Sequence, residues 1–459
     1  MRHAAYFDTL ETRPPEARED ELMAALPHAI AQAMARAPAI AAQLAGVDAR
    51  AVVSREALAA LPVLRKSELL ARQQASRDGG MERRGAAPGD GHTPSIGVAA
   101  GGGRRASDGR AAGGGLAAGS AAKAMGGFSA IGWGEALRVF ASPGPIYEPE
   151  SPRRDYWRFG RALYAAGIRP GQLVYNCFSY HFTPAGSMME TAAHAIGCTV
   201  FPGGTGQSEQ QVRAISDLAP ASYTGTPSFL KIILEKADEM GVALPSLRHA
   251  LVSGEAFPAA LRDSLSARGI DGYQAYGSAD LGLIAYETPA RAGLVLGEEI
   301  IVEIVRPGTG DPVPDGEVGE VVVTTLNPDY PLVRFGTGDL SAVLPGLSPC
   351  GRTNTRIRGW LGRADQATKV RGLFVHPSQV ADILRRHPEA LRARLVIAGE
   401  IGADTMTLHV EARAAPAGLA EAIARSVRDV AKLRADVVLC EPDSLPNDGK
   451  VIADTRNYA

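Results

Sequence analysis

The chain has few cysteines and almost no excess charge. Only four of its 459 residues are cysteines (Cys177, Cys198, Cys350 and Cys440), and they form no CxxC pair. Thiols this far apart form neither a disulfide framework nor the closely spaced ligand set of a structural zinc site. We therefore predict reduced thiols in a cytoplasmic protein.

Long apolar runs and a charge of one sign are also missing. The 48 basic and 50 acidic residues give a formal charge of −2, so no broad field favours nucleic acid or an anionic membrane. The longest apolar-looking stretch, from Leu22 to Leu44, contains too many polar side chains for a membrane span. Pro14 and Pro15 precede any apolar run, so we expect no secretory signal.

What is present is enough apolar material for more than one core. Hydrophobic residues make up 45 % of the chain. Between Glu19 and Leu44 they recur at helical spacing, and Ser54 is typical of a residue that caps a following helix. We predict that residues 1–77 form the helical first part of a large domain.

Residues 78–125 have a different composition. Gly, Ala and Arg dominate and aromatic residues are nearly absent, with runs such as Gly101–Arg105 and Gly113–Gly115. Such a segment buries too little apolar surface to offset its ordering entropy, so we predict disorder. A second hypothesis is that these residues are translated from a shifted reading frame, because the pattern is lost and regained abruptly. Resequencing the coding DNA tests this.

Strand and helix patterns alternate from about residue 156. The alternation indicates βαβ units and a mostly parallel sheet. The expected strands are Leu173–Cys177, Thr199–Phe201, Ser222–Gly225 and His249–Ser253, and the expected helices are Arg158–Ala166, Ala185–Ile196, Gln207–Leu218 and one that starts at Pro227.

The last part of the chain has a different pattern. Ile300–Val305 and Glu320–Thr325 are joined by a turn-rich stretch, which predicts antiparallel strands. After Asp365 the residues suffice for a small α+β domain, with strands near residues 395–397, 407–411 and 436–439 and a helix over residues 419–433. We predict a large domain over residues 126–364 and a C-terminal domain over residues 365–459.

Three glycine-containing motifs carry the candidate chemistry. Gly254-Glu255 and Tyr276–Asp280 each follow a predicted strand, and Arg334–Asp339 contains two tight glycine turns. Each motif alone is weak. A carboxylate such as Asp339, just past a glycine turn at a strand end, suits ribose hydroxyls, and acids close to phosphates position Mg²⁺.

In this order and spacing, the motifs resemble the adenylate-forming superfamily and, within it, the phenylacetate–CoA ligase family. Tyr6–Arg13 and Leu61–Ser67 look like N-terminal signatures of that family, and the likeness is nearly continuous from Phe128 onward. The resemblance implies an α/β fold. A large N-terminal domain of mixed sheets and helices would carry a small, mobile α+β C-terminal domain as a lid.

The resemblance also implies roles for individual residues. The nucleotide-binding positions are Ser142, Gly144, Gly254, Glu255, Ala256, Tyr276, Gly277, Asp339 and Arg363. Among these, residues 253–258 border the adenine, Tyr276 packs near the adenine and the acyl group, and Asp339 binds the ribose. Asp280 stands where the family has a glutamate that holds Mg²⁺, and Tyr180 and His181 lie where the family lines its acyl pocket.

The C-terminal positions belong to the moving domain. Asp365 matches the hinge, and Lys369 and Gly372 match a loop that shapes the thiolation state. Lys450 matches the catalytic lysine that contacts the acid carboxylate and the α-phosphate. A flexible ammonium on a mobile domain suits this role, since it neutralises charge as charge develops.

The chain departs from the family at the phosphate loop. The loop falls at residues 140–149, where Ser142 and Gly144 remain but the lysine is absent and prolines remove N–H donors. Ala279 replaces a phosphate-binding Ser or Thr, and Asp280 is one methylene shorter than the family's glutamate.

These observations predict an AMP-forming acid–CoA ligase that uses ATP, Mg²⁺ and coenzyme A, with an aryl, phenylacetate-like acid and a role in aromatic acid catabolism. We expect a homodimer, and neither nucleic acid nor a membrane as a partner. Two alternatives stay open: an adenylating enzyme whose acceptor is a carrier-protein thiol or an amine, and a degenerate homologue that binds nucleotide or acyl-CoA without turnover.

Overall fold

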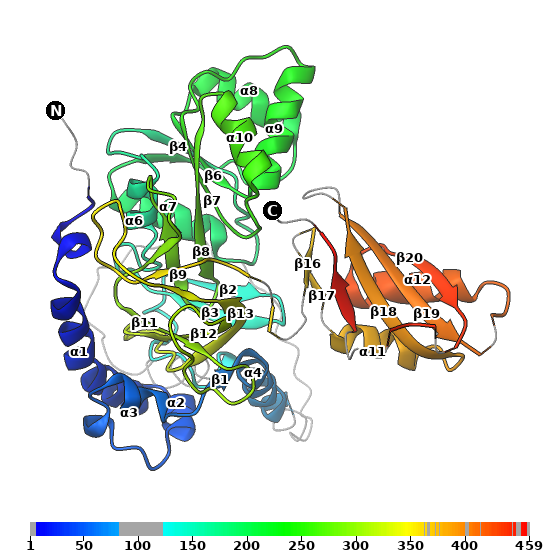
Figure 1. The fold of residues 1–459 in the computed structure, drawn as a ribbon, viewed down its shortest axis with the longest axis horizontal. Helices are drawn as coiled ribbons and strands as arrows, with labels where there is room; N and C mark the ends of the chain where they lie inside the picture. The colour runs from blue at the N-terminus through cyan, green and yellow to red at the C-terminus, as the bar shows by residue number, and fades with distance from the viewer. Residues whose placement is uncertain are drawn as a thin grey trace, which may run out of the picture.

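The computed structural model shows a large domain with a smaller C-terminal unit beside it (Figure 1). The residues that the structure describes are 6–81, 123–361, 363–364, 368–371, 373–375, 377–399, 404–413, 415–442, 444–446 and 451–456. Residues 82–122, which hold most of the segment predicted to be disordered, lie outside the described residues.

The N-terminal segment is helical, as its periodicity predicts. Its elements are η1 (Thr9–Thr12), α1 (Pro15–Arg36), α2 (Pro38–Gln43), η2 (Ala49–Ala51), α3 (Arg55–Ala59) and α4 (Lys66–Met81). Proline at the first position of α1 and of α2 suits a helix start, because no N–H is needed there. The Ser54 hydroxyl accepts a hydrogen bond from Ala57 N, which confirms the predicted cap. Helix α4 continues past residue 77 to Met81.

A nine-stranded sheet forms the centre of the large domain, in the order β14-β15-β10-β9-β8-β7-β6-β4-β5. Its strands are β4 (Leu173–Asn176), β5 (Thr199–Phe201), β6 (Ser222–Gly225), β7 (His249–Val252), β8 (Asp271–Ser278), β9 (Gly282–Glu287), β10 (Leu294–Leu296), β14 (Val343–Leu344) and β15 (Arg356–Ile357). Strands β5, β4, β6, β7 and β8 pair in parallel, which confirms the predicted βαβ units.

Four helices connect the parallel strands: α7 (Ala185–Ala195), α8 (Ser208–Leu218), α9 (Pro227–Glu239) and α10 (Ala259–Ala267). A further helix, α6 (Gly160–Ala165), precedes β4. Helices α8, α9 and α10 gather at one end of the large domain in Figure 1. Leu230 and Ile233 of α9 are fully buried and pack with Val252 of β7, as expected for a helix that covers a sheet face.

A second, four-stranded sheet has the order β1-β13-β12-β11. Its strands are β1 (Leu64–Arg65), β11 (Ile300–Val305), β12 (Gly319–Thr325) and β13 (Phe335–Ser341). Strands β11 and β12 pair antiparallel, as predicted. Strand β1 pairs in parallel with β13, so the N-terminal segment is tied to a strand about 270 residues later in the chain.

The expected phosphate-loop segment is a β-hairpin. Strands β2 (Arg138–Ser142) and β3 (Ile146–Glu150) pair antiparallel along their full length, from Arg138 with Glu150 to Ser142 with Ile146. Expecting a loop over residues 140–149 was therefore wrong. In the paired strands, N–H groups of one strand donate to carbonyl oxygens of the other, and Ala141 N donates to Phe182 O.

The C-terminal unit is α+β, as predicted, with a core of its own. Its sheet has the order β20-β19-β18-β21, and a two-stranded sheet, β16-β17, precedes it. The elements are β16 (Thr368–Val370), β17 (Leu373–Val375), α11 (Pro377–Arg385), β18 (Ala390–Ala398), β19 (Thr405–Ala412), α12 (Leu419–Ala431), β20 (Asp436–Cys440) and β21 (Ile452–Asp454).

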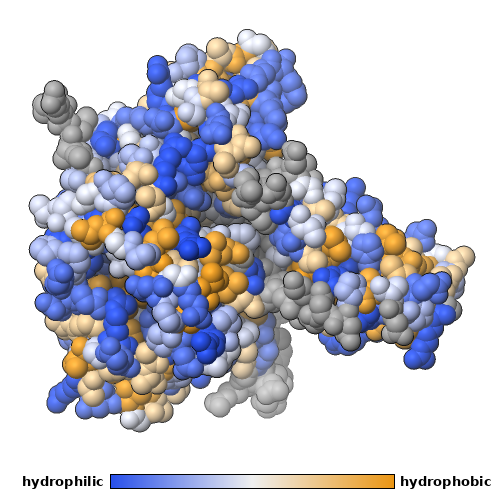
Figure 2. All heavy atoms as spheres, viewed as in Figure 1, coloured by the Kyte–Doolittle hydropathy of each residue, from blue (hydrophilic) through white to orange (hydrophobic). Residues whose placement is uncertain are grey.

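The visible surface is mostly hydrophilic, as the lack of long apolar runs in the sequence predicts. Hydrophilic residues are spread over the visible face of both units in Figure 2. Among the described helices none has both the length and the apolar character needed to cross a membrane.

Candidate active site

Most of the predicted nucleotide-binding residues meet in one region. Gly254, Glu255 and Ala256 directly follow β7, and Tyr276 and Gly277 lie near the end of β8. Because β7 and β8 are parallel neighbours, these residues share the carboxyl edge of the sheet, where ligands of such sheets bind. The sequence placed Tyr276 and Gly277 after the strand. They lie within it, since β8 runs to residue 278.

Asp339 is the centre of a group that we call the ribose-side cluster: Asp339, Tyr276, Trp360 and Arg363. One carboxylate oxygen of Asp339 accepts a hydrogen bond from the Tyr276 hydroxyl at 2.9 Å. The other accepts from Trp360 Nε1 and from Arg363 Nη1, each at 3.0 Å. A carboxylate has about four acceptor sites, so three donors fix its orientation and leave room for a ligand hydroxyl.

Backbone geometry explains how Asp339 reaches this position. The preceding Gly338 has φ +74°, a conformation that glycine adopts without strain, and the partner strand shifts register between Glu320 and Val322. A bulge of this kind redirects side chains and is common beside active sites. Asp339 directly follows Gly338, as expected, but it lies inside β13 and not at a strand end.

A second group contains Lys66, Asp280, Glu148 and Ser142, and we call it the phosphate-side cluster. Lys66 Nζ lies 2.7 Å from Asp280 Oδ2. The Asp280 side chain is only 1 % exposed, whereas 37 % of the Lys66 side chain reaches solvent. Asp280 Oδ1 is buried, and no described residue forms a hydrogen bond with it. In the carboxylate predicted to face Mg²⁺, one oxygen therefore has a partner and the other is left to bind a ligand or metal ion.

Glu148 adds a second buried acid to this cluster. It is fully buried and accepts hydrogen bonds from the backbone N–H and the hydroxyl of Ser142. Burial, followed by the nearby charge of Asp280, raises the pKa of Glu148 well above its usual range. Burial alone would lower the pKa of Lys66, but attraction to Asp280 and Glu148 raises it. Lys66 therefore stays charged between two acids.

Ser142 is hydrogen-bonded within the hairpin. Both of its donors are directed to Glu148. The hairpin is also held from α4, where the Gln73 amide accepts a hydrogen bond from Tyr147 N at 2.8 Å and donates one to Tyr147 O at 3.0 Å. Gly144 occupies the turn between β2 and β3, and the nucleotide-binding roles assigned to Ser142 and Gly144 stay predictions.

Tyr276 and Gly277 are fixed by their surroundings. Burial, followed by the charge of Asp339, raises the pKa of Tyr276 well above its usual value, so its hydroxyl remains a hydrogen-bond donor. A Cβ on Gly277 would lie 2.5 Å from the carbonyl oxygen of Gly282, so the strand pairing requires glycine at this position.

The two predicted acyl-pocket residues differ in their setting. Tyr180 is half-buried, and its hydroxyl accepts a hydrogen bond from Asn176 Nδ2 at 2.8 Å. Asn176 is fully buried and also pairs with Gly186 O and the Thr224 hydroxyl, so it holds Tyr180 firmly. His181 is exposed on the loop that follows.

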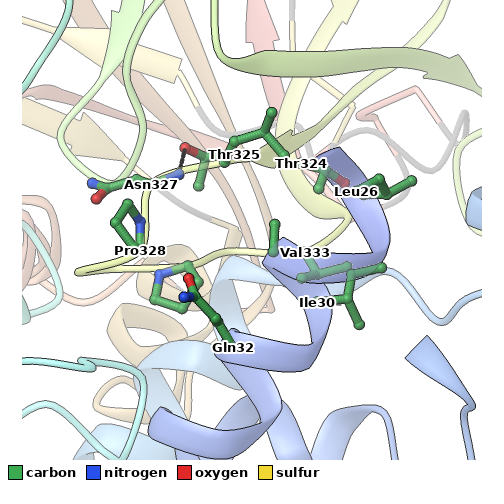
Figure 3. A pocket seen from close by; sticks show the side chains of 11 residues that line it. Leu26, Ile30, Gln32, Thr324, Thr325, Asn327, Pro328 and Val333 are labelled. Atoms are coloured by element: carbon green, nitrogen blue, oxygen red, sulfur yellow. Dashed lines mark hydrogen bonds between the residues drawn. The ribbon is translucent and has the colours of Figure 1, made fainter. Parts of the chain in front are cut away.

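An internal cavity lies elsewhere. It has a volume of about 20 Å³, between α1 and the segment after β12, and its lining includes Leu26, Ile30, Asn327 and Val333 (Figure 3). This volume suits about one water molecule, and no predicted site residue lines it.

Several predicted residues are not placed. Lys450, Asp365 and Gly372 lie outside the described residues. The backbone of Lys369 lies in β16, where it pairs with Phe374 of β17. The roles assigned to these four positions stay predictions.

Sequence reasoning missed three residues of the two clusters: Lys66, Glu148 and Trp360. Lys66 belongs to the N-terminal signature Leu61–Ser67, but nothing in the sequence indicates that it reaches a residue 214 positions later. Trp360 stands near Arg363, and its proximity to that motif residue is the one signal available.

Within the described residues no group of three or more His, Cys, Asp or Glu side chains is arranged to hold a metal ion. Mg²⁺ does not need such a cage, because it keeps several waters and binds one or two carboxylates together with substrate phosphates. The unpartnered Oδ1 of Asp280 fits this requirement.

Comparison with known proteins agrees with this geometry. A family model described as AMP-binding enzyme matches residues 155–327, which include the loop after β7, Tyr276 and Asp280. Phenylacetate-coenzyme A ligase from Thermus thermophilus is 33 % identical over 293 residues, or 60 % of this chain and 66 % of that protein. Phenylacetate-coenzyme A ligase from Aromatoleum evansii is 30 % identical over 333 residues, or 67 % of this chain and 75 % of that protein.

The chain belongs to the phenylacetate–coenzyme A ligase family. This membership confirms the resemblance and the expectation of an adenylate-forming acid–CoA ligase. A solved structure of 2-hydroxyisobutyryl-CoA ligase, in complex with 2-HIB-AMP and CoA, superposes with a TM-score of 0.78 at 23 % identity and covers 100 % of this chain and 94 % of that one. The predicted fold, a large domain followed by a small C-terminal one, is thereby confirmed.

The AMP-binding match covers the carboxyl edge of the central sheet. It starts at residue 155, after the hairpin of β2 and β3, and includes β7, β8 and the loop between them.

Proposed function

We propose that this member of the phenylacetate–CoA ligase family activates an aryl, phenylacetate-like acid in two steps. In the first, a carboxylate oxygen attacks the α-phosphorus of ATP, forming an acyl adenylate and releasing pyrophosphate. In the second, the thiolate of coenzyme A attacks the acyl carbon and AMP leaves. The observation that carries this proposal is the orientation of Asp339 by three donors beside the carboxyl edge of the sheet.

The chain's contribution to both steps is positioning and charge stabilisation. We assign the ribose hydroxyls to Asp339 and the adenine to the loop that holds Gly254, Glu255 and Ala256. Tyr276 donates to Asp339 and presents its ring to the adenine and the acyl group. Arg363 adds positive charge at the same place, since its Nη1 lies 3.0 Å from Asp339.

We assign the acyl group to the side of Tyr180 and His181, where Asn176 fixes the Tyr180 hydroxyl. Mg²⁺ would be held by Asp280 and would neutralise phosphate charge. Lys450 would contact the acid carboxylate and the α-phosphate, with Asp365 as the hinge and with Lys369 and Gly372 on the thiolation side. These assignments follow the family motifs.

Location and assembly belong to the same proposal. The free cysteines, two of them buried, suit the cytoplasm, where thiols stay reduced. A homodimer is expected, and size-exclusion chromatography with light scattering tests it. The net charge of −2 gives no broad attraction to nucleic acid.

A second candidate function rests on the hairpin. Ser142 directs both donors to Glu148, and a degenerate homologue without a phosphate cradle would bind nucleotide or acyl-CoA without turnover. A ligase with a carrier thiol or an amine as the acceptor would keep the first step.

AMP release separates these candidates. Purified protein is incubated with Mg·ATP and a panel of aryl and short-chain acids, with coenzyme A, an amine or no acceptor. Acid-dependent AMP release with coenzyme A supports the proposal, and release with the amine alone supports the other acceptor. Nucleotide binding without AMP release from any acid supports the degenerate homologue.

A further inference from the structure

Lys66 occupies an unusual position for a residue of the N-terminal segment. It begins α4 immediately after β1, whose two residues pair with Phe335 and Gly336 of β13. The pairing brings Lys66 beside the strand that carries Asp339. The Lys66 ammonium then reaches Asp280, which follows β8, at 2.7 Å. Lys66 thus joins the two sheets at the site.

The ion pair of Lys66 leaves one acceptor open. Its ammonium lies 2.7 Å from Oδ2 of the buried carboxylate of Asp280. Asp280 Oδ1 is buried without a partner. Buried ion pairs that serve the fold have their remaining acceptors satisfied, because an unpaired buried oxygen is destabilising. The cluster therefore has the character of a binding site.

Lys66 is also able to contact a ligand while it keeps its ion pair. An ammonium has three N–H donors, and the contact with Asp280 uses one. The 37 % exposure of the Lys66 side chain places the ion pair at the protein surface, whereas the Asp280 side chain is only 1 % exposed.

The neighbouring hairpin offers no free positive charge for a phosphate. The segment of residues 140–149 has no lysine, and its Ser142 donors are used by Glu148. We propose that Lys66 binds the β- and γ-phosphates of ATP, in place of the lysine that the hairpin lacks. This inference rests on the proposed function, since the roles of Asp339 and Asp280 give the direction in which the phosphates run.

Nucleotide binding tests the inference without turnover. Calorimetry without any acid measures the affinities of AMP and of Mg·ATP for the wild-type protein, Lys66→Met, Lys66→Arg and the control Lys231→Met. Lys231 is an exposed lysine of α9 paired with Glu235. We expect wild-type protein and Lys231→Met to prefer ATP, and Lys66→Met to lose about tenfold or more of that preference with AMP affinity unchanged. Lys66→Arg should keep most of it.

Lysine labelling of the wild-type protein gives a second measurement, which does not depend on a folded variant. A water-soluble amine-acylating reagent, read out by mass spectrometry, should modify Lys66 more slowly with ATP or pyrophosphate present but not with AMP. Lys231 should be labelled equally in all cases.

The outcomes are distinct. An ATP preference that survives in Lys66→Met, or labelling of Lys66 that ATP leaves unchanged, would overturn this inference alone. Wild-type protein that binds neither nucleotide would overturn both this inference and the proposed function.

Discussion

The two sides of the candidate site are satisfied to different degrees. On the ribose side, Asp339 accepts hydrogen bonds from three side chains, and its orientation is set before any ligand arrives. On the phosphate side, the buried Asp280 pairs with Lys66, and its Oδ1 has no hydrogen-bond partner among the described residues. The ribose side is preorganised, whereas the phosphate side contains a buried carboxylate oxygen that a ligand or metal ion could still bind.

The difference predicts how each cluster responds to a ligand or a substitution. A satisfied cluster mainly positions its ligand, and removing one donor loses one contact. An unsatisfied buried cluster is sensitive to charge. Ligands, pH and substitutions should therefore change its affinity and stability more than they change those of a satisfied cluster. The following experiments test this contrast, from the largest expected effect to the smallest.

The largest effect is expected at the α-phosphate, where the two sides meet. Lys450→Ala should lower the rate of adenylate formation by about 10²–10³-fold, because in the proposed role its ammonium stabilises the transition state. Thioester formation from a supplied acyl adenylate should remain. Single-turnover assays of each half-reaction measure this, with Lys231→Met as the control. Equal loss in both half-reactions would contradict a role confined to adenylation.

The ribose side is tested by Asp339→Ala. Loss of the carboxylate removes the ribose contact and leaves the donors of Tyr276, Trp360 and Arg363 without their acceptor. We expect AMP and ATP affinity to fall together by about 10- to 100-fold. Calorimetry with both nucleotides measures this. A loss restricted to ATP would place Asp339 on the phosphate side and break the contrast.

The phosphate side is tested by pH with Glu148→Gln. The pKa of Glu148 is raised in the folded protein, so above the ordinary value of 4.5 the folded state binds more protons than the unfolded state. Stability must then fall as pH rises through this window. We expect the unfolding temperature of the wild-type protein to fall from pH 4.5 upward, and Glu148→Gln to show a smaller fall.

The matched control for this prediction is Glu209→Gln on α8. Glu209 is exposed and paired with Arg213, and its pKa is lowered by that arginine. Its substitution should leave the fall with rising pH in place. Identical pH profiles of the wild-type protein and Glu148→Gln would show that Glu148 carries no buried charge penalty.

The smallest effect is expected from Trp360→Phe. Trp360 is 38 % exposed and contributes one of the three donors to Asp339, at 3.0 Å. Phenylalanine keeps an aromatic ring and loses the N–H, so we expect AMP affinity to fall by only about two- to fivefold. A fall as large as that of Asp339→Ala would mean that the tryptophan ring itself contacts the nucleotide.

Much of the fold could be predicted from the sequence, because local patterns decide it. The run from Leu173 to Val252 alternates short apolar strands with amphipathic helices, and the observed parallel strands follow that pattern closely. The ends of β8 and β13 could not be predicted, because both strands continue through glycines that resemble turns. In β13 a bulge accommodates Gly338, and strand pairing elsewhere in the chain decides this.

The site was predicted where single motifs carry it. Asp339, Tyr276 and Arg363 lie together as their motifs imply. The hairpin at residues 138–150 was missed because the order of the family motifs along the chain assigned a loop there. The structure depends instead on the pairing of β2 with β3 and on hydrogen bonds with Gln73. The contact of Lys66 with Asp280 depends on a fold that joins residues 214 positions apart.

The central claim is that this protein forms an acyl adenylate. Acid-dependent exchange of labelled pyrophosphate into ATP, measured with a panel of aryl acids, tests it most directly. We predict exchange with at least one aryl acid, absent without acid and strongly reduced in Lys450→Ala. Folded protein that binds ATP yet shows no exchange with any acid would contradict the claim.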